Sequence, residues 1–153
     1  MNIAFGTDHG GFSLKHSIIE KLNQLNVNIL DMGSHTLDDD DDYPDIVEPV
    51  AKAVSSGKAQ RGILLCGSGI GASITANKFP GVRASVCHDF YSAKQGVEHD
   101  DMNMLCVGGR VLGTSLILEI ILAFLNAEFQ KDERFVRRLN KVLDIEKEYF
   151  KLN

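Results

Sequence analysis

Short apolar runs alternate along the chain with segments in which apolar residues recur every three or four positions. The runs predict strands at Asn2–Gly6, Val27–Met32, Ile63–Cys66, Val82–Cys87 and Asn103–Val107. A segment with helical periodicity follows each run. Repeated alternation of strand and helix is typical of an α/β protein, in which a parallel sheet lies between two layers of helices.

The helical segments have recognisable ends. The first helix is expected to run to about Leu25, the second to end at Gly57, the third to begin near Ala72, and the fourth to span Tyr91–Glu98. Thr114 is expected to cap a helix over Ser115–Phe129. That helix is apolar nearly all round, which predicts burial on both sides, in the core or against another subunit.

A final helix begins after Asp132, its expected cap, and has no strand of its own to cover. Such a C-terminal helix extension suggests an arm that reaches a second subunit. Its apolar residues fall on one side of the helix: Val136, Leu139, Val142, Leu143 and Phe150.

The most distinctive stretch is the glycine loop that follows the third strand, with glycine at positions 67, 69 and 71. Such a loop before a helix presents successive backbone N–H groups and favours a bound negative charge. Cys66 comes directly before it, and the same amides are expected to stabilise its thiolate. The stretch therefore combines a candidate base or nucleophile with a candidate anion hole.

The loop admits two other interpretations. Gly67-x-Gly69-x-x-Ala72 fits the dinucleotide fingerprint, with Asp89 at a suitable distance for a ribose-binding acid, but the loop belongs to the third strand and not the first. A cysteine-dependent phosphatase would need arginine where Ala72 stands, so that interpretation fails. Cys87 and Cys106 are expected to be inert core residues.

Ionisable residues gather after the predicted strands. Asp8 and His9 follow the first strand, His88 and Asp89 the fourth, and Arg110 the fifth. In a doubly wound parallel sheet these positions share one edge, where ligands bind. The five consecutive aspartates at positions 38 to 42 are instead expected to form a solvated acidic loop.

Composition restricts the class of protein. The 153 residues are expected to form one domain, and a net charge of −5 argues against a nucleic-acid platform. The longest apolar stretch, Leu116–Leu125, contains Glu119 and is too short to span a bilayer. Three cysteines without metal-ligand spacing, and no leader segment after Met1, are expected of a cytoplasmic protein.

Four segments together resemble the ribose/galactose isomerase family, which includes ribose-5-phosphate isomerase B and the galactose-6-phosphate isomerase subunits. They are MNIAFGTDHGGFSLK, DYP at 42–44, ILLCGSGIGASITANK and EHDDMNMLCVGGRV. The resemblance implies a five-stranded Rossmann-like fold and a homodimer or dimer of dimers with sites between subunits. It also implies aldose–ketose isomerisation of a small phosphorylated sugar, without metal or cofactor.

The resemblance also implies roles for single residues. Cys66 matches the family's base, Ser68 a hydroxyl that relays a proton, and His99 the histidine that opens the sugar ring. The anion hole corresponds to the amides of Gly67, Gly69, Ile70 and Gly71. Asp8 matches a carboxylate that holds sugar hydroxyls, with Tyr43 and Asn77 as neighbours. The phosphate ligands correspond to His9, Arg110, Arg134 and Arg138.

One position departs from the family pattern. Asp100 follows His99 where many relatives carry asparagine, and a carboxylate there opposes an anionic intermediate. The substrate therefore stays open between ribose 5-phosphate and a six-carbon sugar phosphate such as allose or galactose 6-phosphate. A nucleotide-binding module and a catalytically silent sugar-phosphate-binding subunit remain as alternatives.

Overall fold

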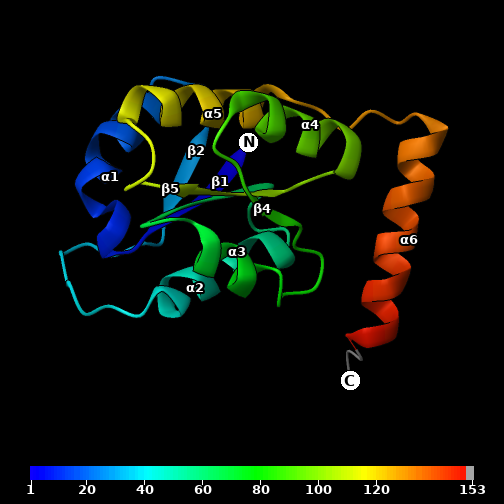
Figure 1. The fold of residues 1–153 in the computed structure, drawn as a ribbon, viewed down its shortest axis with the longest axis horizontal. Helices are drawn as coiled ribbons and strands as arrows, with labels where there is room; N and C mark the ends of the chain where they lie inside the picture. Colours follow the sequence, from blue (N-terminus) through cyan, green and yellow to red (C-terminus); the bar gives the residue numbers. More distant parts are fainter. Residues whose placement is uncertain (151–153) are drawn as a thin grey trace.

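A computed structural model describes residues 1–150 and contains a five-stranded parallel sheet in the order β2-β1-β3-β5-β4 (Figure 1). The strands are β1 Asn2–Thr7, β2 Asn28–Asp31, β3 Arg61–Cys66, β4 Ala84–Val86 and β5 Met104–Gly108. Each corresponds to a predicted apolar run, so the α/β fold with a parallel sheet is confirmed.

Five helices cover the two faces of the sheet. The helices are α1 His9–Leu22, α2 Tyr43–Ser55, α3 Ile70–Ala76, α4 Phe90–Asp100, α5 Thr114–Asn126 and α6 Glu133–Tyr149. Alternate residues of a strand point to opposite faces of the sheet. Ile63 and Leu65 therefore enter the core beneath α1, α4 and α5, while Leu64 and Cys66 enter the core beneath α2 and α3. Figure 1 shows that α6 covers neither face and stands apart, beyond the β4 edge.

The last two helices have apolar sides that this chain covers only in part. One side of α5 is buried, whereas Leu116 and Leu122 on the other side keep 36% and 37% of their surface exposed. In α6 the buried residue is Phe135, and Val142 of the predicted apolar side is exposed at the edge of a groove between α6 and β4. Burial of these two sides against a second subunit stays a prediction.

The strand order reverses between β1 and β3, and this creates the place where a ligand can bind. The chain leaves β1 toward β2 on one side, and β3 lies on the other, with Gly6 opposite Leu64 and Thr7 opposite Leu65. Loops that leave these two strands diverge to opposite faces, so a crevice opens above their carboxyl ends.

Candidate active site

A cavity of about 420 Å³ lies above the carboxyl ends of β1 and β3. It brings together most of the predicted residues of the strand-end loops. Its lining consists of Asp8, Tyr43, Cys66, Gly67, Ser68, Gly69, Gly71, Ala72, Arg110 and Val111.

The glycine loop has its shape because side chains would not fit. Gly69 has φ 81° and lies so close to the β5 backbone that a Cβ would come within 3.3 Å of Val107. At Gly71 a Cβ would come within 2.6 Å of the Tyr43 ring, which packs directly on this glycine. The loop after β5 closes the other side, where the Arg110 N–H donates to the Gly67 carbonyl at 3.1 Å.

Asp8 begins α1 and faces Cys66. Its carboxylate accepts a hydrogen bond from the Gly10 N–H at 2.8 Å and is only 5% exposed. Burial, and then the charge of Asp8, raise the pKa of the Cys66 thiol, and burial also raises the pKa of Asp8. The sequence predicts that the loop amides stabilise the thiolate, whereas burial and the Asp8 carboxylate act against it, and the spacing of Cys66 and the glycines reveals neither of these two effects.

Asp41, which the sequence patterns did not identify as a site residue, holds His9 in place. The Nδ1 atom of His9 lies 2.6 Å from Oδ1 of Asp41, and the His9 backbone N–H donates to Oδ2 of the same carboxylate at 3.0 Å. The prediction of a wholly solvated acidic loop is thus wrong at Asp41. No spacing signal could have found it, because five identical residues in a row do not show which one turns inward.

A second group of predicted residues lies elsewhere, where the end of α4 meets the start of α6. The His99 ring stacks on the buried Phe135 ring, with centroids 4.1 Å apart and an angle of 16° between the planes. The Arg134 guanidinium lies over the same Phe135 ring at 4.4 Å. Nδ1 of His99 also lies 2.9 Å from the Gln95 side-chain amide. Neither His99 nor Arg134 lines the cavity around Cys66.

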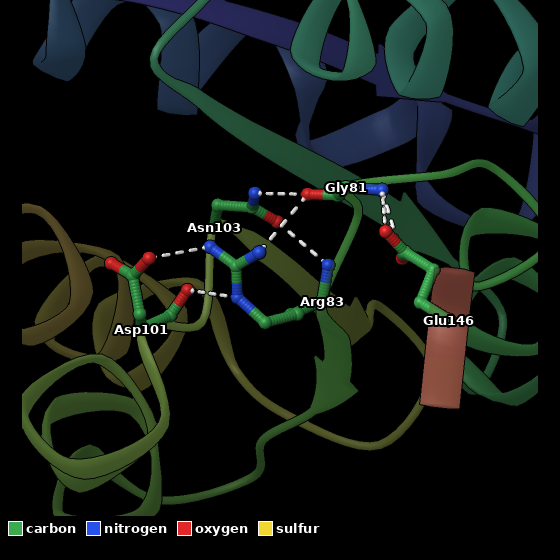
Figure 2. Close-up of polar contacts among 5 residues, drawn as sticks. All are labelled: Gly81, Arg83, Asp101, Asn103 and Glu146. Atoms are coloured by element: carbon green, nitrogen blue, oxygen red, sulfur yellow. Dashed lines mark hydrogen bonds and ion pairs between the residues drawn. The ribbon is translucent and has the colours of Figure 1, made fainter. Parts of the chain in front are cut away.

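A polar network fixes the turn that follows His99, and it also holds α6 (Figure 2). Asp101 ends α4 with a left-handed backbone, φ 51°, and its carboxylate pairs with Arg83 at 2.6 Å. The Arg83 backbone N–H donates to Asn103. At the other end of the network the Gly81 N–H donates to both carboxylate oxygens of Glu146, at 3.0 and 2.9 Å. The network therefore joins the α4–β5 turn, the start of β4 and the end of α6.

The remaining predicted residues also lie outside the cavity. Asn77 uses its side-chain amide to pair with Ala84 at the free edge of β4, with bonds of 2.8 and 2.9 Å. Asp100 lines a separate groove of about 500 Å³ between α4, β4 and α6. Arg138 on α6 and Ile70 beside the glycine loop are exposed. The structure thus divides the predicted residues between two places.

One contact argues against the dinucleotide interpretation of the glycine loop. Asp89 caps α4, where its carboxylate accepts from the Ser92 N–H at 2.7 Å and from the Ser92 hydroxyl at 2.8 Å. It is therefore engaged as a helix cap and not as a ribose-binding acid. Cys87 and Cys106 are buried in the core, as predicted, and Cys66 alone among the three free thiols lines the cavity.

Within residues 1–150 no group of three or more His, Cys, Asp or Glu side chains is arranged to hold a metal ion. None of the helices of this part of the chain combines the length and apolar character that a bilayer crossing requires.

Comparison with known proteins identifies the family of this chain. The sequence profile of the ribose/galactose isomerase family matches residues 3–142. The chain belongs to this family. It is 43% identical to ribose-5-phosphate isomerase B of Escherichia coli, over 94% of this chain and 95% of that protein.

Other relatives share the sequence and the fold. The chain is 42% identical to D-erythrulose-4-phosphate isomerase of Pectobacterium atrosepticum, over 85% of this chain and 86% of that protein. The solved structure of ribose-5-phosphate isomerase B from Clostridium thermocellum superposes with a TM-score of 0.92 at 46% identity, covering 97% of this chain and 99% of that one.

Proposed function

We propose that this chain interconverts ribose 5-phosphate and ribulose 5-phosphate by an aldose–ketose isomerisation that proceeds through an enediolate. The observation that carries the proposal is the position of Cys66. Its thiol faces a cavity that also contains a carboxylate, a glycine loop and Arg110, and the chain belongs to a sugar-phosphate isomerase family.

The reaction needs a base beside the carbonyl and a site for the charge that develops. Cys66, as the thiolate, removes the proton from C2 of the aldose, and Asp8 beside it holds the sugar hydroxyls. The electron pair of the broken C–H bond forms the C1–C2 double bond, and the π pair of the C1 carbonyl moves to O1, where the amides of the glycine loop stabilise the negative charge. Ser68 passes a proton between O1 and O2, and Cys66 returns its proton to C1, which yields the ketose.

Two further functions, ring opening and phosphate binding, require residues outside this cavity. We assign ring opening to His99, and phosphate binding to Arg134 and Arg138 together with His9 and Arg110. Arg134 and Arg138 are four residues apart on α6 and therefore share one face of that helix. Because His99 and Arg134 lie by α6, away from Cys66, we propose that each site combines both groups from two subunits of a homodimer or a dimer of dimers.

Exposed apolar side chains support this assembly. They lie on α3, at the start of α4 and on α6, where Val142 and Ile145 line the groove of about 500 Å³ between α6 and the β4 edge. Examples are Ile70, Ile74, Phe90, Tyr91, Val142 and Ile145, which are exposed by half or more. Clustered apolar surface of this kind is typical of a protein interface. A cytoplasmic location accords with the three free thiols.

A four-carbon substrate is the second candidate. The relative from Pectobacterium atrosepticum is named D-erythrulose-4-phosphate isomerase, and its identity to this chain is within one percentage point of that of the Escherichia coli enzyme. D-erythrulose 4-phosphate undergoes the same proton transfers at C1 and C2 and is one carbon shorter. Asp100 is the residue whose charge would oppose an enediolate, so its contact with substrate bears on this choice.

The test is interconversion of the two pentose phosphates by the purified protein with EDTA present. We expect activity that survives EDTA, disappears in Cys66→Ala and persists in Cys87→Ala, a cysteine that lies outside the cavity. Activity retained in Cys66→Ala would exclude Cys66 as the base. Higher kcat/KM for D-erythrulose 4-phosphate, or for a six-carbon phosphate, would move the proposal to that substrate.

A further inference from the structure

One member of the acidic loop differs from its neighbours. Asp41 lies between β2 and α2, and its side chain is only 11% exposed, whereas Asp38, Asp39 and Asp40 are exposed. Its carboxylate accepts three hydrogen bonds, two from His9 and one from the Ser34 hydroxyl at 3.3 Å. An acidic residue in a solvated loop would not be held at both oxygens.

These bonds determine how the His9 ring is presented. Nδ1 faces a carboxylate oxygen at 2.6 Å and must carry a hydrogen to donate to it, so Nε2 is the ring nitrogen left for another ligand. The bond from the backbone N–H to the same carboxylate fixes the first residue of α1 as well. Both the ring and the helix start are therefore fixed relative to the cavity.

The charges around His9 favour its cationic form. The hydrogen bond to Asp41 raises the pKa of His9 most, the charge of Asp8 at the end of β1 raises it further, and the charge of Arg110 after β5 lowers it. A raised pKa means that folded His9 keeps its proton to a higher pH than a free histidine does. A contact that needs the cation is therefore retained as the pH rises through the usual histidine range, and is lost only above the raised pKa.

We propose that Asp41 is a positioning residue for the phosphate group, because it holds His9 as a fixed cation whose Nε2–H donates to a phosphate oxygen beside Arg110. A phosphate dianion gains most from a charged donor with fixed geometry. Without the carboxylate, the neutral ring could present an unprotonated nitrogen to the phosphate, which would repel it. This inference rests on the proposed function, in which His9 is a phosphate ligand.

The experiment compares Asp41→Asn with Asp40→Asn, which removes the same charge from the exposed part of the same run. The Ki of inorganic phosphate and the KM for ribose 5-phosphate are measured between about pH 7 and pH 8.5, where the phosphate monoester of the substrate is a dianion, and each variant is compared with the wild type at the same pH. In Asp41→Asn we expect both constants to rise with pH until they exceed those of the wild type by roughly tenfold, with kcat little changed. Asp40→Asn should follow the wild type.

Titration of the His9 ring by NMR gives a readout that does not depend on turnover. We expect the wild-type ring to titrate above the ordinary histidine range, the Asp41→Asn ring to titrate at lower pH, and added inorganic phosphate to shift the ring signals. A wild-type ring that titrates in or below the ordinary range overturns the inference, even if the variant does not fold. Constants for Asp41→Asn that match those of Asp40→Asn at every pH also overturn it.

Failure of the proposed function would give different experimental results from failure of this inference. A wild-type protein that isomerises neither pentose nor tetrose phosphate, but whose His9 signals respond to inorganic phosphate and depend on Asp41, supports the inference and refutes the proposed reaction. A His9 ring that does not respond to phosphate in an active enzyme refutes the inference and leaves the reaction standing.

Discussion

Two inactive variants should complement each other if the site is shared between subunits. Cys66→Ala removes the base from the cavity above β1 and β3, and His99→Ala removes the ring-opening group from the cluster beside α6. In a dimer with shared sites, a hybrid of the two variants rebuilds one complete site, from the Cys66 of one subunit and the His99 of the other. Its second site lacks both groups.

The size of the effect follows from symmetry. Random exchange between equal amounts of the two variants makes half of the dimers hybrid, and each hybrid has one intact site of two, so about one quarter of wild-type activity should return. The assay is isomerisation of ribose 5-phosphate, whose ring form requires the opening step. The activity of each variant alone is subtracted. Hybrids isolated with two different affinity tags should have about half of the wild-type activity.

A reciprocal hybrid makes the test decisive. Wild type paired with a chain that carries both substitutions contains no complete site if the sites are shared, because each site lacks either Cys66 or His99. If each chain holds its own site, the same hybrid keeps half of its activity and the hybrid of single variants has none. That pattern, or a protein that stays monomeric while active, would refute the shared site.

Two more outcomes follow from the structure. Arg61→Met should lower the free energy of unfolding by about 2 to 4 kcal/mol, because the guanidinium donates to the carbonyls of Phe124 and Ala127 at the end of α5. Thermal or urea unfolding measures this change, and an unchanged free energy of unfolding would contradict the prediction. Asp8→Asn should speed alkylation of Cys66 by iodoacetamide at about pH 8, because it removes a negative charge that raises the pKa of the thiol. The other two thiols are buried and serve as internal controls, and an unchanged or slower rate would show that Asp8 does not keep the thiol neutral.

The local features of the site were predictable because they depend on neighbouring residues. Three glycines at alternate positions after an apolar run predict a tight loop at the end of a strand, and the structure has it between Cys66 and the start of α3. Asp8 and Arg110 follow β1 and β5, and the topology of a parallel sheet brings them to the same edge. The sequence pattern and the sheet topology together were sufficient to predict the residues around the cavity at Cys66.

Features that depend on contacts across the fold were not predictable in this way. The pKa of Cys66 is raised first by burial and then by the carboxylate of Asp8, which follows β1, and spacing within the glycine loop reveals neither. Asp41 and Phe135 act through contacts with His9 and with His99, between segments far apart in the chain. The sequence marks the residues that carry the chemistry better than the residues that hold them in place.

The attachment of α6 at two points explains how its apolar side stays available for a second subunit. Phe135 fixes one end of the helix against His99, and Glu146 fixes the other end through the Gly81 N–H, about 16 Å further along the axis at a rise of about 1.5 Å per residue. These two attachments fix the orientation of the helix, and therefore the direction in which the face with Arg134 and Arg138 points. They do so without burying the residues that lie between them. Hydrophobic periodicity predicts a face that needs covering, but not which chain covers it. In the proposed dimer the second copy does so, and the same contact that buries this face brings the arginines to a cavity in the other subunit.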